Sequence, residues 1–429
     1  MYNKVLFVGL GGSGGKTLRF IKREMNRWLD SHGINSGIPS GWQFLWIDTP
    51  TQPDGGEIDG LADRLEDTEY LGLVAPGAQL VDFVNALDAN PDATHELRTW
   101  RVNPATTTVA VAMGAGQFRA VGQTIALASV SRIKAEFDRA FAAINSDGDK
   151  DLAELYTQVH NEPPSAFENQ THVIIVSSLS GGTGAGLLNT VCDILRVHPE
   201  SNAADNLFGF LYTPEVFDSL GAAAIGGVQP NSLAAISELL NGYWWAGDAS
   251  EGAQQSHESA ISPIPAALLQ SAGLAANLTK SGPEYPFLVG RVGAGNVAIN
   301  SPSALFQLVG RSLVSLITNK EASDSFFPYI VTNYSNASIQ ANVNDTDVLV
   351  NKGPHGTPPF QAVGFSRVSL GTDYFEDYTT RRIAKDAISH LTKWHAASPD
   401  AKRRASELET DDQEKITLEL AKPFLIPFL

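Results

Sequence analysis

Short apolar runs alternate along this chain with segments whose apolar residues recur at helical spacing. The apolar runs lie at residues 4–8, 44–48, 171–176, 207–217 and 286–290, the fourth ending in a proline turn. The helical patterns lie at residues 18–29, 120–143, 190–195, 230–240 and 300–317. Strands that alternate with helices in this way predict an α/β domain with a largely parallel sheet.

Glycine-rich loops precede three of the predicted helices, at residues 9–17, 109–123 and 177–189, and the first and last of them directly follow predicted strands. The last of these carries Gly181, Gly182, Gly184 and Gly186. Glycines let backbone N–H groups approach an anion, and a helix start adds partial positive charge there. Because ligands of parallel sheets bind at the carboxyl ends of the strands, we expect all three loops at one phosphate-binding edge. A glycine turn selected only for packing is the alternative.

The first glycine loop allows two further interpretations. Gly9, Gly11 and Gly14 fit the G-x-G-x-x-G dinucleotide fingerprint, which would favour an NAD-dependent oxidoreductase. Residues 15–17 resemble the end of a P-loop, but the position that should hold its first glycine is Leu10. Both folds need a single glycine loop, so neither interpretation explains residues 181–186.

The rest of the pattern predicts how the chain is divided. The helix at 300–317 is apolar on nearly all sides, is capped by Asn300 or Ser301, and suits a strut between two domains. Beyond it we expect strands at 329–332, 348–350 and 362–370 and a helix at 374–395, and we expect a charged loop at 147–151. The predicted parts are a nucleotide-binding domain at 1–299 with insertions at 57–105 and 247–282, a central helix at 300–318, a smaller α/β domain at 319–398 and a tail at 399–429.

Composition narrows the functional classes. A net charge of -17 argues against nucleic-acid binding through a basic surface. The single cysteine, Cys192, rules out disulfides within the chain and favours a reducing, cytoplasmic location, with the thiol buried in a helix. The sequence has no signal-peptide pattern and no uncharged apolar stretch long enough to span a membrane. The apolar end of the chain predicts either continuation beyond Leu429 or a tail packed on its own domain.

The glycine loops, in this order and with a central helix after them, resemble the tubulin/FtsZ superfamily, and more closely the bacterial tubulin-like domain proteins. Residues 181–186 match the signature G-G-T-G-[ST]-G except at Ala185. Residues 9–16 match G-x-G-G-x-G-G-N except at Lys16, and 114–123 resemble the γ-phosphate loop without its Asn-Pro. Residues 213–217 and 228–239 are similar to the ribose-side loop and to the segment after it. The resemblance covers about residues 1–400.

The resemblance implies a Rossmann-like domain that binds GTP or GDP with Mg²⁺, without a metal site built from protein ligands alone. Residues 181–186 would hold the α- and β-phosphates. Asp48 would reach the Mg²⁺ shell through water or cap its own loop, and Asn300 would bind the base or only cap the helix. The implied nucleotide-binding residues are Gly11, Gly12, Ser13, Gly14, Lys16, Asp48, Gly114, Ala115, Gly116, Gly181, Gly182, Thr183, Gly184, Ala185, Gly186, Glu215, Asn231, Asn296 and Asn300.

The family's catalytic loop, N-x-D-x-x-[DE], follows its central helix and enters the nucleotide site of the next subunit. Asn319, Glu321 and Asp324 fit this pattern, with Glu321 in place of the first Asp. Such acids position the water that attacks the γ-phosphate. A solvated helix end, or the acidic segment 342–347 in the same role, is the alternative.

These patterns lead to one principal hypothesis and one runner-up. The principal hypothesis is a GTPase that self-associates head-to-tail into filaments, with adaptor proteins still to be identified, no nucleic-acid partner and no membrane span. The departures at Lys16, Ala185 and Glu321 favour the runner-up, a GTP-binding scaffold or switch with little hydrolysis.

Overall fold

A computed structural model describes most of the chain in two units, residues 1–365 and 366–429. The described residues are 1–53, 65–97, 101–164, 170–201, 206–219, 225–245, 264–275, 278, 281–293, 298–299, 301–330, 332, 360–362 and 372–397. In the second unit they form one helix, α14 (Thr372–Ala397), which confirms the helix predicted at 374–395.

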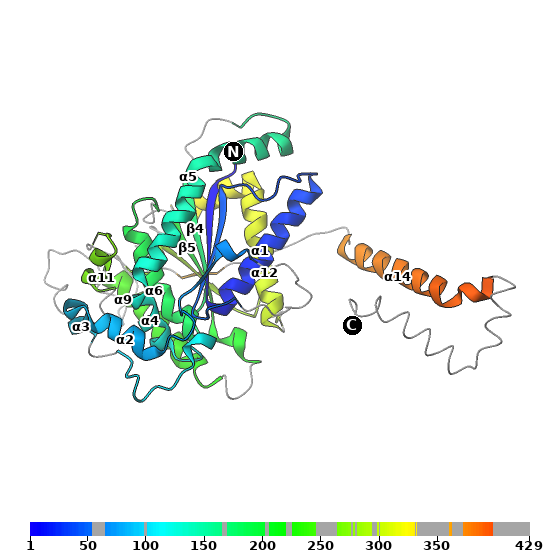
Figure 1. Cartoon of the computed structure of the whole chain (residues 1–429). Coiled ribbons are helices and arrows are strands. Elements are labelled where there is room, and N and C mark those ends of the chain that lie inside the picture. Colours follow the sequence, from blue (N-terminus) through cyan, green and yellow to red (C-terminus); the bar gives the residue numbers. More distant parts are fainter. Residues whose placement is uncertain are drawn as a thin grey trace, which may run out of the picture. The chain divides into compact units, whose positions relative to one another are not determined.

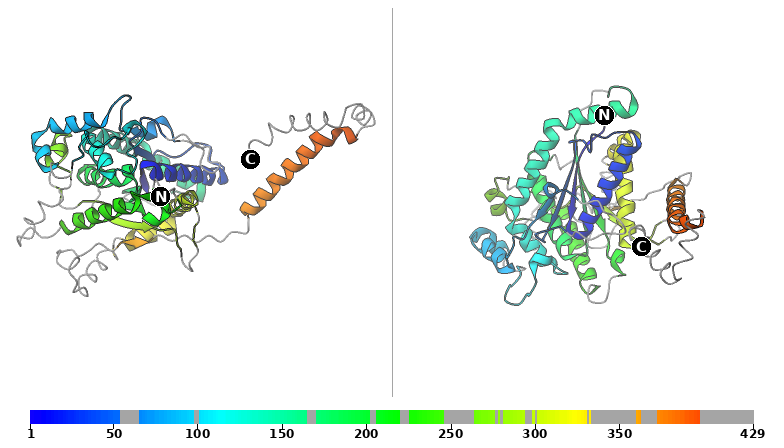
Figure 2. Two further views of the ribbon diagram at one scale, coloured as in Figure 1. Left: turned by 90° about the horizontal axis from the view of Figure 1, so that it is seen from below. Right: turned by 45° about the vertical axis from the view of Figure 1, so that its right-hand side comes forward.

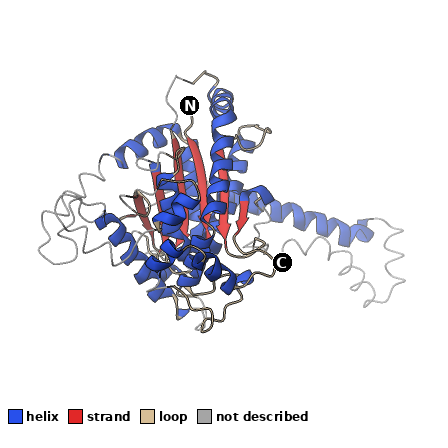
Figure 3. Ribbon diagram, turned by 60° about the vertical axis from the view of Figure 1, so that its left-hand side comes forward, coloured by secondary structure: helices blue, strands red, loops and turns tan. Residues whose placement is uncertain are grey.

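The first unit is built on a seven-stranded sheet in the order β3-β2-β1-β4-β5-β6-β7, with all strand pairs parallel (Figures 1 and 3). The predicted parallel α/β fold is therefore confirmed. The strands are β1 (Lys4–Leu10), β2 (Trp42–Asp48), β3 (Tyr70–Gly72), β4 (Thr171–Ser178), β5 (Leu207–Tyr212), β6 (Tyr285–Val289) and β7 (Gln361–Ala362).

Helices cover both faces of the sheet (Figure 3). They are α1 (Gly11–Ser31), α2 (Leu80–Asp88), α3 (Pro91–Leu97), α4 (Arg119–Ala128), α5 (Val130–His160), α6 (Gly182–Val197), α9 (Val228–Trp245), α11 (Ala266–Ser271) and α12 (Pro302–Thr318). Residues 320–330 are also helical, and short 3-10 turns occupy Asp67–Glu69, Val111–Met113 and Pro214–Phe217. None of the described helices is long and apolar enough to cross a membrane.

Alternation along the strands divides the core into two clusters. Val5 and Phe7 of β1 pack into the cluster that contains α1 and α12, while Leu6 and Val8 pack into the one that contains α4 and α6. Since β1 is buried on both faces, it can be the nearly continuous apolar run seen in the sequence.

Helix α12 lies along α1, as Figure 1 and the right-hand view of Figure 2 show. Its contact face is buried, including Phe306, Val309 and Leu313. Ser301 is its N-cap, because the Ser301 hydroxyl accepts a hydrogen bond from the Ala304 backbone N–H at 3.1 Å. Asn300, the other predicted cap, lies outside the described residues. The predicted domain limits on either side of α12 stay a prediction.

Two predicted element boundaries are wrong because tertiary packing overrides local preference. The first helix begins at Gly11 instead of residue 18, so the glycine loop forms its opening turns. The expected charged loop at 147–151 lies inside α5. Gly148 is buried there, and a Cβ on it would lie 2.9 Å from the Cα of Gly41, so this glycine allows close approach of another segment.

Three further expectations change in detail. The predicted insertion at 57–105 contributes an edge strand, β3, to the main sheet. The strand expected at 329–332 is wrong, because Tyr329, Ile330 and Thr332 are helical and Ile330 is buried. Of the strand expected at 362–370 only Ala362 is described, and it belongs to β7 beside β6.

Candidate functional site

Strands β1 and β4 lie side by side at the centre of the sheet. From β1 the chain adds β2 and β3 toward one edge, and from β4 it adds β5, β6 and β7 toward the other, so the strand order reverses between β1 and β4. In doubly wound sheets such a switch point is where ligands bind, outside the carboxyl ends of the strands. Helix α1 starts at Gly11, directly after β1, and α6 starts at Gly182, four residues after the end of β4. Both glycine loops therefore flank the switch point.

The two helix starts carry positive partial charge that neither their N-cap residues nor their first turns neutralise. Neither N-cap makes a side-chain hydrogen bond, and neither first turn has an acidic residue. The two starts also touch, because a Cβ on Gly11 would lie 2.8 Å from the backbone nitrogen of Gly184. Two adjacent, uncapped N-termini favour an anion at this point.

The third glycine loop joins the same place. The backbone N–H of Gly182 donates to the carbonyl of Gly116 at 3.0 Å. Gly114 and Gly116 have φ of 121° and 57°, a region that favours glycine. Helix α4 begins just after this loop, also without a side-chain cap. The structure thus brings together the three loops that the sequence singled out.

The glycines in these loops have two kinds of surroundings. A Cβ on Gly12 or Gly181 would meet nothing within 4 Å, so the backbone there borders open space. A Cβ on Gly14 would lie 2.4 Å from the carbonyl oxygen of Val176, and one on Gly182 would lie 2.4 Å from that of Gly116. Packing therefore explains some of these glycines, and open backbone that suits a phosphate remains at Gly12 and Gly181.

Thr49, at the end of β2, ties the loops together, and the sequence patterns did not single it out. Its hydroxyl lies 2.9 Å from the hydroxyl of Thr183 and accepts a hydrogen bond from the Ala115 N–H at 3.1 Å. The residue is completely buried. Its position directly after a strand-ending aspartate, Asp48, is the one feature of the sequence that could have drawn attention to it.

Asp48 caps its own loop. Its Oδ1 accepts a hydrogen bond from the Thr49 backbone N–H at 2.7 Å, and the residue is 6% exposed. Burial raises the pKa of Asp48 to about 6, against the opposing effect of hydrogen bonds from Thr49, Trp46 and Thr183. The carboxyl group therefore lies beside Thr183 of the glycine loop, and its pKa is only slightly below neutral pH.

The other predicted nucleotide contacts are spread over neighbouring elements. The Asn231 side-chain N–H donates to the carbonyls of Gln117 and Ser180, at 2.9 and 3.0 Å, so this amide links two of the loops. Glu215 lies in the 3-10 turn after β5. Ser13 and Lys16 are half-buried in the first two turns of α1, and Ala185 is buried in α6. Asn296 and Asn300 lie outside the described residues.

The predicted catalytic residues lie at the opposite edge of the sheet. Asn319 ends α12, and its side-chain oxygen accepts a hydrogen bond from the Ala322 N–H at 3.0 Å, which starts the next helix. The Asn3 amide donates to the Ser323 hydroxyl at 2.8 Å, which holds this helix beside the start of β1. Strand β1 has seven residues, so roughly 20 Å separates its two ends.

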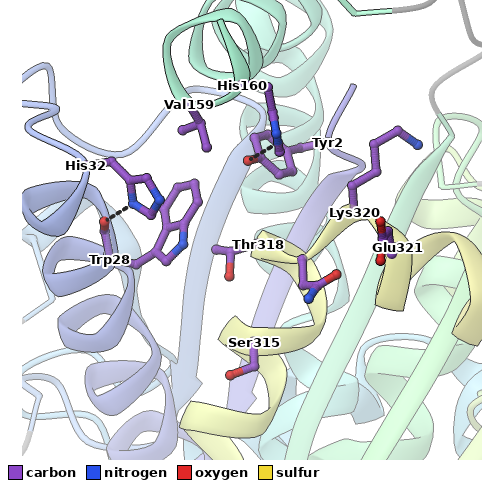
Figure 4. A pocket seen from close by; sticks show the side chains of 10 residues that line it. Tyr2, Trp28, His32, Val159, His160, Ser315, Thr318, Lys320 and Glu321 are labelled. Atoms are coloured by element: carbon purple, nitrogen blue, oxygen red, sulfur yellow. Dashed lines mark hydrogen bonds between the residues drawn. The ribbon is translucent and has the colours of Figure 1, made fainter. Parts of the chain in front are cut away.

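Glu321 and Asp324 are both exposed at that edge, and Asp324 forms an ion pair with Lys320. A pocket of about 490 Å³ opens beside them where the last turns of α1, α5 and α12 meet (Figure 4). It is lined by Tyr2, Trp28, His32, Val159, His160, Ser315, Thr318, Asn319, Lys320 and Glu321. The structure therefore places Asn319 and Glu321 together, away from the glycine loops of the same chain.

No group of three or more His, Cys, Asp or Glu side chains that could hold a metal ion occurs in the part of the chain that the structure describes. An ion such as Mg²⁺ would need ligands from a bound phosphate in addition to a nearby group such as Asp48 or Thr183.

A doubly wound parallel sheet, with three glycine loops and uncapped helix starts at its switch point, is an α/β arrangement of the kind that commonly binds phosphate groups. A family model described as tubulin like matches residues 6–389, so the chain belongs to the tubulin-like family. This agrees with the resemblance seen in the sequence and argues against the oxidoreductase alternative. The comparison with curated proteins gave no match.

Solved structures similar to this chain include two CetZ proteins and an FtsZ. CetZ from Methanosaeta thermophila strain DSM 6194 is 12% identical, with a TM-score of 0.34 over 77% of this chain and 60% of that one. An empty FtsZ dimer from M. jannaschii is 16% identical, with a TM-score of 0.31 over 75% and 57%. GDP-bound monomeric CetZ1 from Haloferax volcanii is 10% identical, with a TM-score of 0.31 over 80% and 74%. The chain thus spans less than two thirds of the length of the first two of these proteins.

Proposed function

We propose that this protein binds GTP at the carboxyl edge of its sheet and assembles head-to-tail into filaments. In such a filament the Asn319–Asp324 segment of one copy completes the hydrolytic site of the next. The observation that carries the proposal is the separation of the two sets of residues to opposite ends of β1 within one chain.

The uncapped starts of α1 and α6 support the phosphate part of the proposal. A triphosphate at the switch point would accept hydrogen bonds from the open backbone at Gly12 and Gly181. The third loop, Gly114 to Gly116, would face the terminal phosphate, as its resemblance to the γ-phosphate loop implies, and its hydrogen bond to Gly182 holds it at the start of α6. Mg²⁺, when bound, would neutralise charge on the phosphate oxygens.

Distance supports the assembly part. Hydrolysis needs a carboxylate that positions water within hydrogen-bond reach of the terminal phosphate. Asp324 and Glu321 lie beside the start of β1, and the glycine loops lie beyond its end, roughly 20 Å away. A head-to-tail neighbour brings the two edges together, and because that contact is heterologous it extends into an open filament.

Turnover measured against protein concentration tests this proposal. GTP hydrolysis per chain should rise with concentration, because the site is completed only between copies. Asp324→Ala should lower the maximal rate at least about 100-fold while GTP affinity stays within twofold, as expected for loss of a catalytic carboxylate. Asp92→Ala, which removes an exposed acid on α3, is the matched control and should hydrolyse GTP normally. Turnover that does not depend on concentration would contradict the assembly-dependent mechanism.

The runner-up function, a GTP-binding switch with little hydrolysis, is favoured by one contact. The Lys320–Asp324 ion pair engages the carboxylate that would position water. Sedimentation with GTP and with a slowly hydrolysed analogue separates the two functions, since a switch that does not assemble stays in the supernatant with either. The mass of the nucleotide released on denaturing the purified protein identifies the base.

A further inference from the structure

Large apolar side chains are exposed around the glycine loops. Met113 is 87% exposed directly before Gly114, and Phe118 is 55% exposed at the N-cap of α4. Leu233 of α9 is 69% exposed, two residues after Asn231, which is hydrogen-bonded to Gln117 of the same loop. Single exposed apolar residues are ordinary, but three on adjoining elements at one edge point to a surface that a partner covers.

The pocket at the opposite edge has aromatic walls. Tyr2 and Trp28 meet edge to face, with 5.8 Å between ring centroids, and Tyr156 and His160 continue the cluster at 4.3 Å. Figure 4 shows Trp28, Tyr2 and Val159 around the pocket, together with Ser315 and Thr318 of α12. Its volume of about 490 Å³ is within the range of about 300–1,000 Å³ of ligand pockets, so side chains of a partner can enter it.

We propose that Met113 and Phe118 of one copy enter this pocket in the next copy. The inference rests on the proposed head-to-tail assembly and names its specific contact. When Asn319 and Glu321 approach a neighbour's glycine loops, the side chains that flank those loops must approach the residues that flank Asn319 and Glu321. On the glycine side these include Met113 and Phe118, and on the other side they form the pocket.

The aromatic side of the pocket is complementary to these two side chains, while its other side, from Ser315 to Glu321, is polar. A thioether packs favourably against aromatic rings, and an aromatic side chain such as Phe118 can join the edge-to-face cluster of Tyr2 and Trp28. The contact is between two different patches of the same chain, so it does not close into a two-fold dimer. Because Asn319 and Glu321 are part of the pocket wall, filling the pocket also positions the segment proposed to act in hydrolysis.

Cross-linking between introduced cysteines tests the contact. Cys192 is completely buried, so only introduced thiols should react with a short bismaleimide in the folded protein. Met113→Cys mixed with Ser315→Cys should give a cross-linked dimer with GTP. Neither variant alone should give a cross-linked dimer. The control is Met113→Cys mixed with Ala135→Cys, which places a thiol on the exposed side of α5 and should not cross-link either.

Two further variants test the contact without cross-linking. The double variant Met113→Ser, Phe118→Ser should need an about tenfold higher protein concentration for half-maximal sedimentation, because it loses a hot spot of the interface. Ser315→Trp, at an exposed position, should fill the pocket and have the same effect while GTP binding is kept.

The outcomes distinguish this inference from the proposed function. If filaments sediment with GTP but Met113→Cys and Ser315→Cys give no more cross-linked dimer than the Ala135→Cys control, the pocket contact is wrong and head-to-tail assembly stands. If the unmodified protein does not sediment with GTP at any concentration, both are wrong. Assembly that is unaffected by Ser315→Trp would also overturn the contact, since the pocket would then have another occupant.

Discussion

Two glycines in the first turn of α1 have opposite surroundings, although they are two residues apart. A Cβ on Gly12 would meet nothing within 4 Å, whereas one on Gly14 would lie 2.4 Å from the carbonyl oxygen of Val176 in β4. The first is free to serve a ligand, and the second is needed for the helix to pack on the sheet.

Substitutions at these two glycines should therefore separate binding from folding. Gly12→Asp should keep the melting temperature, because an acid in a first helical turn is compatible with the helix dipole, and should weaken GTP binding at least about tenfold by repulsion. Gly14→Ala should lower the free energy of unfolding by about 1–3 kcal/mol through overpacking. Thermal unfolding and nucleotide titration measure both. A loss of stability in Gly12→Asp equal to that in Gly14→Ala would contradict this division.

Asp193 of α6 is, after Asp48, a second carboxyl group whose pKa is raised by burial. Its Oδ1 accepts hydrogen bonds from the Ser281 hydroxyl at 2.7 Å and the Gly282 N–H at 3.2 Å, while its Oδ2 has no partner among the described residues. Burial raises the pKa of Asp193 to about 6, against the opposing hydrogen bond from Ser281. The folded chain thus binds the proton of this carboxyl group more tightly than the unfolded chain does.

This shift predicts a pH dependence of stability. Because the folded pKa is raised above the unfolded value, the stabilisation is complete below about pH 4 and is lost as pH rises through about 6. Compared with Asp193→Asn, the wild type should lose up to about 3 kcal/mol in free energy of unfolding between pH 4 and pH 7. Asp48 titrates in the same range in both proteins, so it cancels in the difference. A difference that stays constant with pH would show that Asp193 is not held in this way.

Among the helices, α5 shows how packing decides where an element ends. The segment Asp147-Gly-Asp is polar and contains glycine, yet α5 continues through it to His160. Leu152, Leu155 and Tyr156 after it are buried in the cluster with Trp42, and burial of these residues compensates for the weak helix preference of the segment.

Gly148→Ala should therefore destabilise the protein although alanine is the better helix former. Alanine gains about 1 kcal/mol in a helix interior, but its Cβ would lie 2.9 Å from the Cα of Gly41, and backbone cannot move away cheaply. We expect a net loss of about 1–2 kcal/mol in denaturant unfolding. Asp147→Ala, at the exposed neighbouring position, should change stability by less than about 0.5 kcal/mol. Equal stability of the two variants would mean that the contact with Gly41 is loose.

For the whole chain, the division of the proposed site between two edges leads to a test by mixing. Asp324→Ala keeps intact glycine loops, and Gly12→Asp keeps an intact Asp324. Each variant alone should hydrolyse GTP poorly, whereas a one-to-one mixture should recover up to about a quarter of wild-type turnover, the share of interfaces with both intact halves in a random filament. Mixing Asp324→Ala with Glu321→Ala is the control, since both defects lie on one edge. No recovery in the first mixture would contradict a site shared between copies.

The sequence by itself determined the parallel α/β class and the three glycine loops. Buried strands appear as continuous apolar runs such as Val173–Val176, and helices as apolar residues at helical spacing, because each pattern records which faces of an element are buried. The signature around Gly181–Gly186 also led to the tubulin-like family, which the family match confirms. These features are local, so a single stretch of chain carries them.

Only the tertiary structure decided what depends on residues far apart in the chain. The hydroxyl of Thr49 meets Thr183 across 134 positions, Gly148 meets Gly41, and Ser323 meets Asn3, and no local pattern marks any of these pairs. The last contact places Asn319 and Asp324 at the amino edge, opposite Gly11 and Gly182. That placement follows from the direction of β1 and the length of α12, since a helix that runs back along a parallel sheet ends where the strands begin.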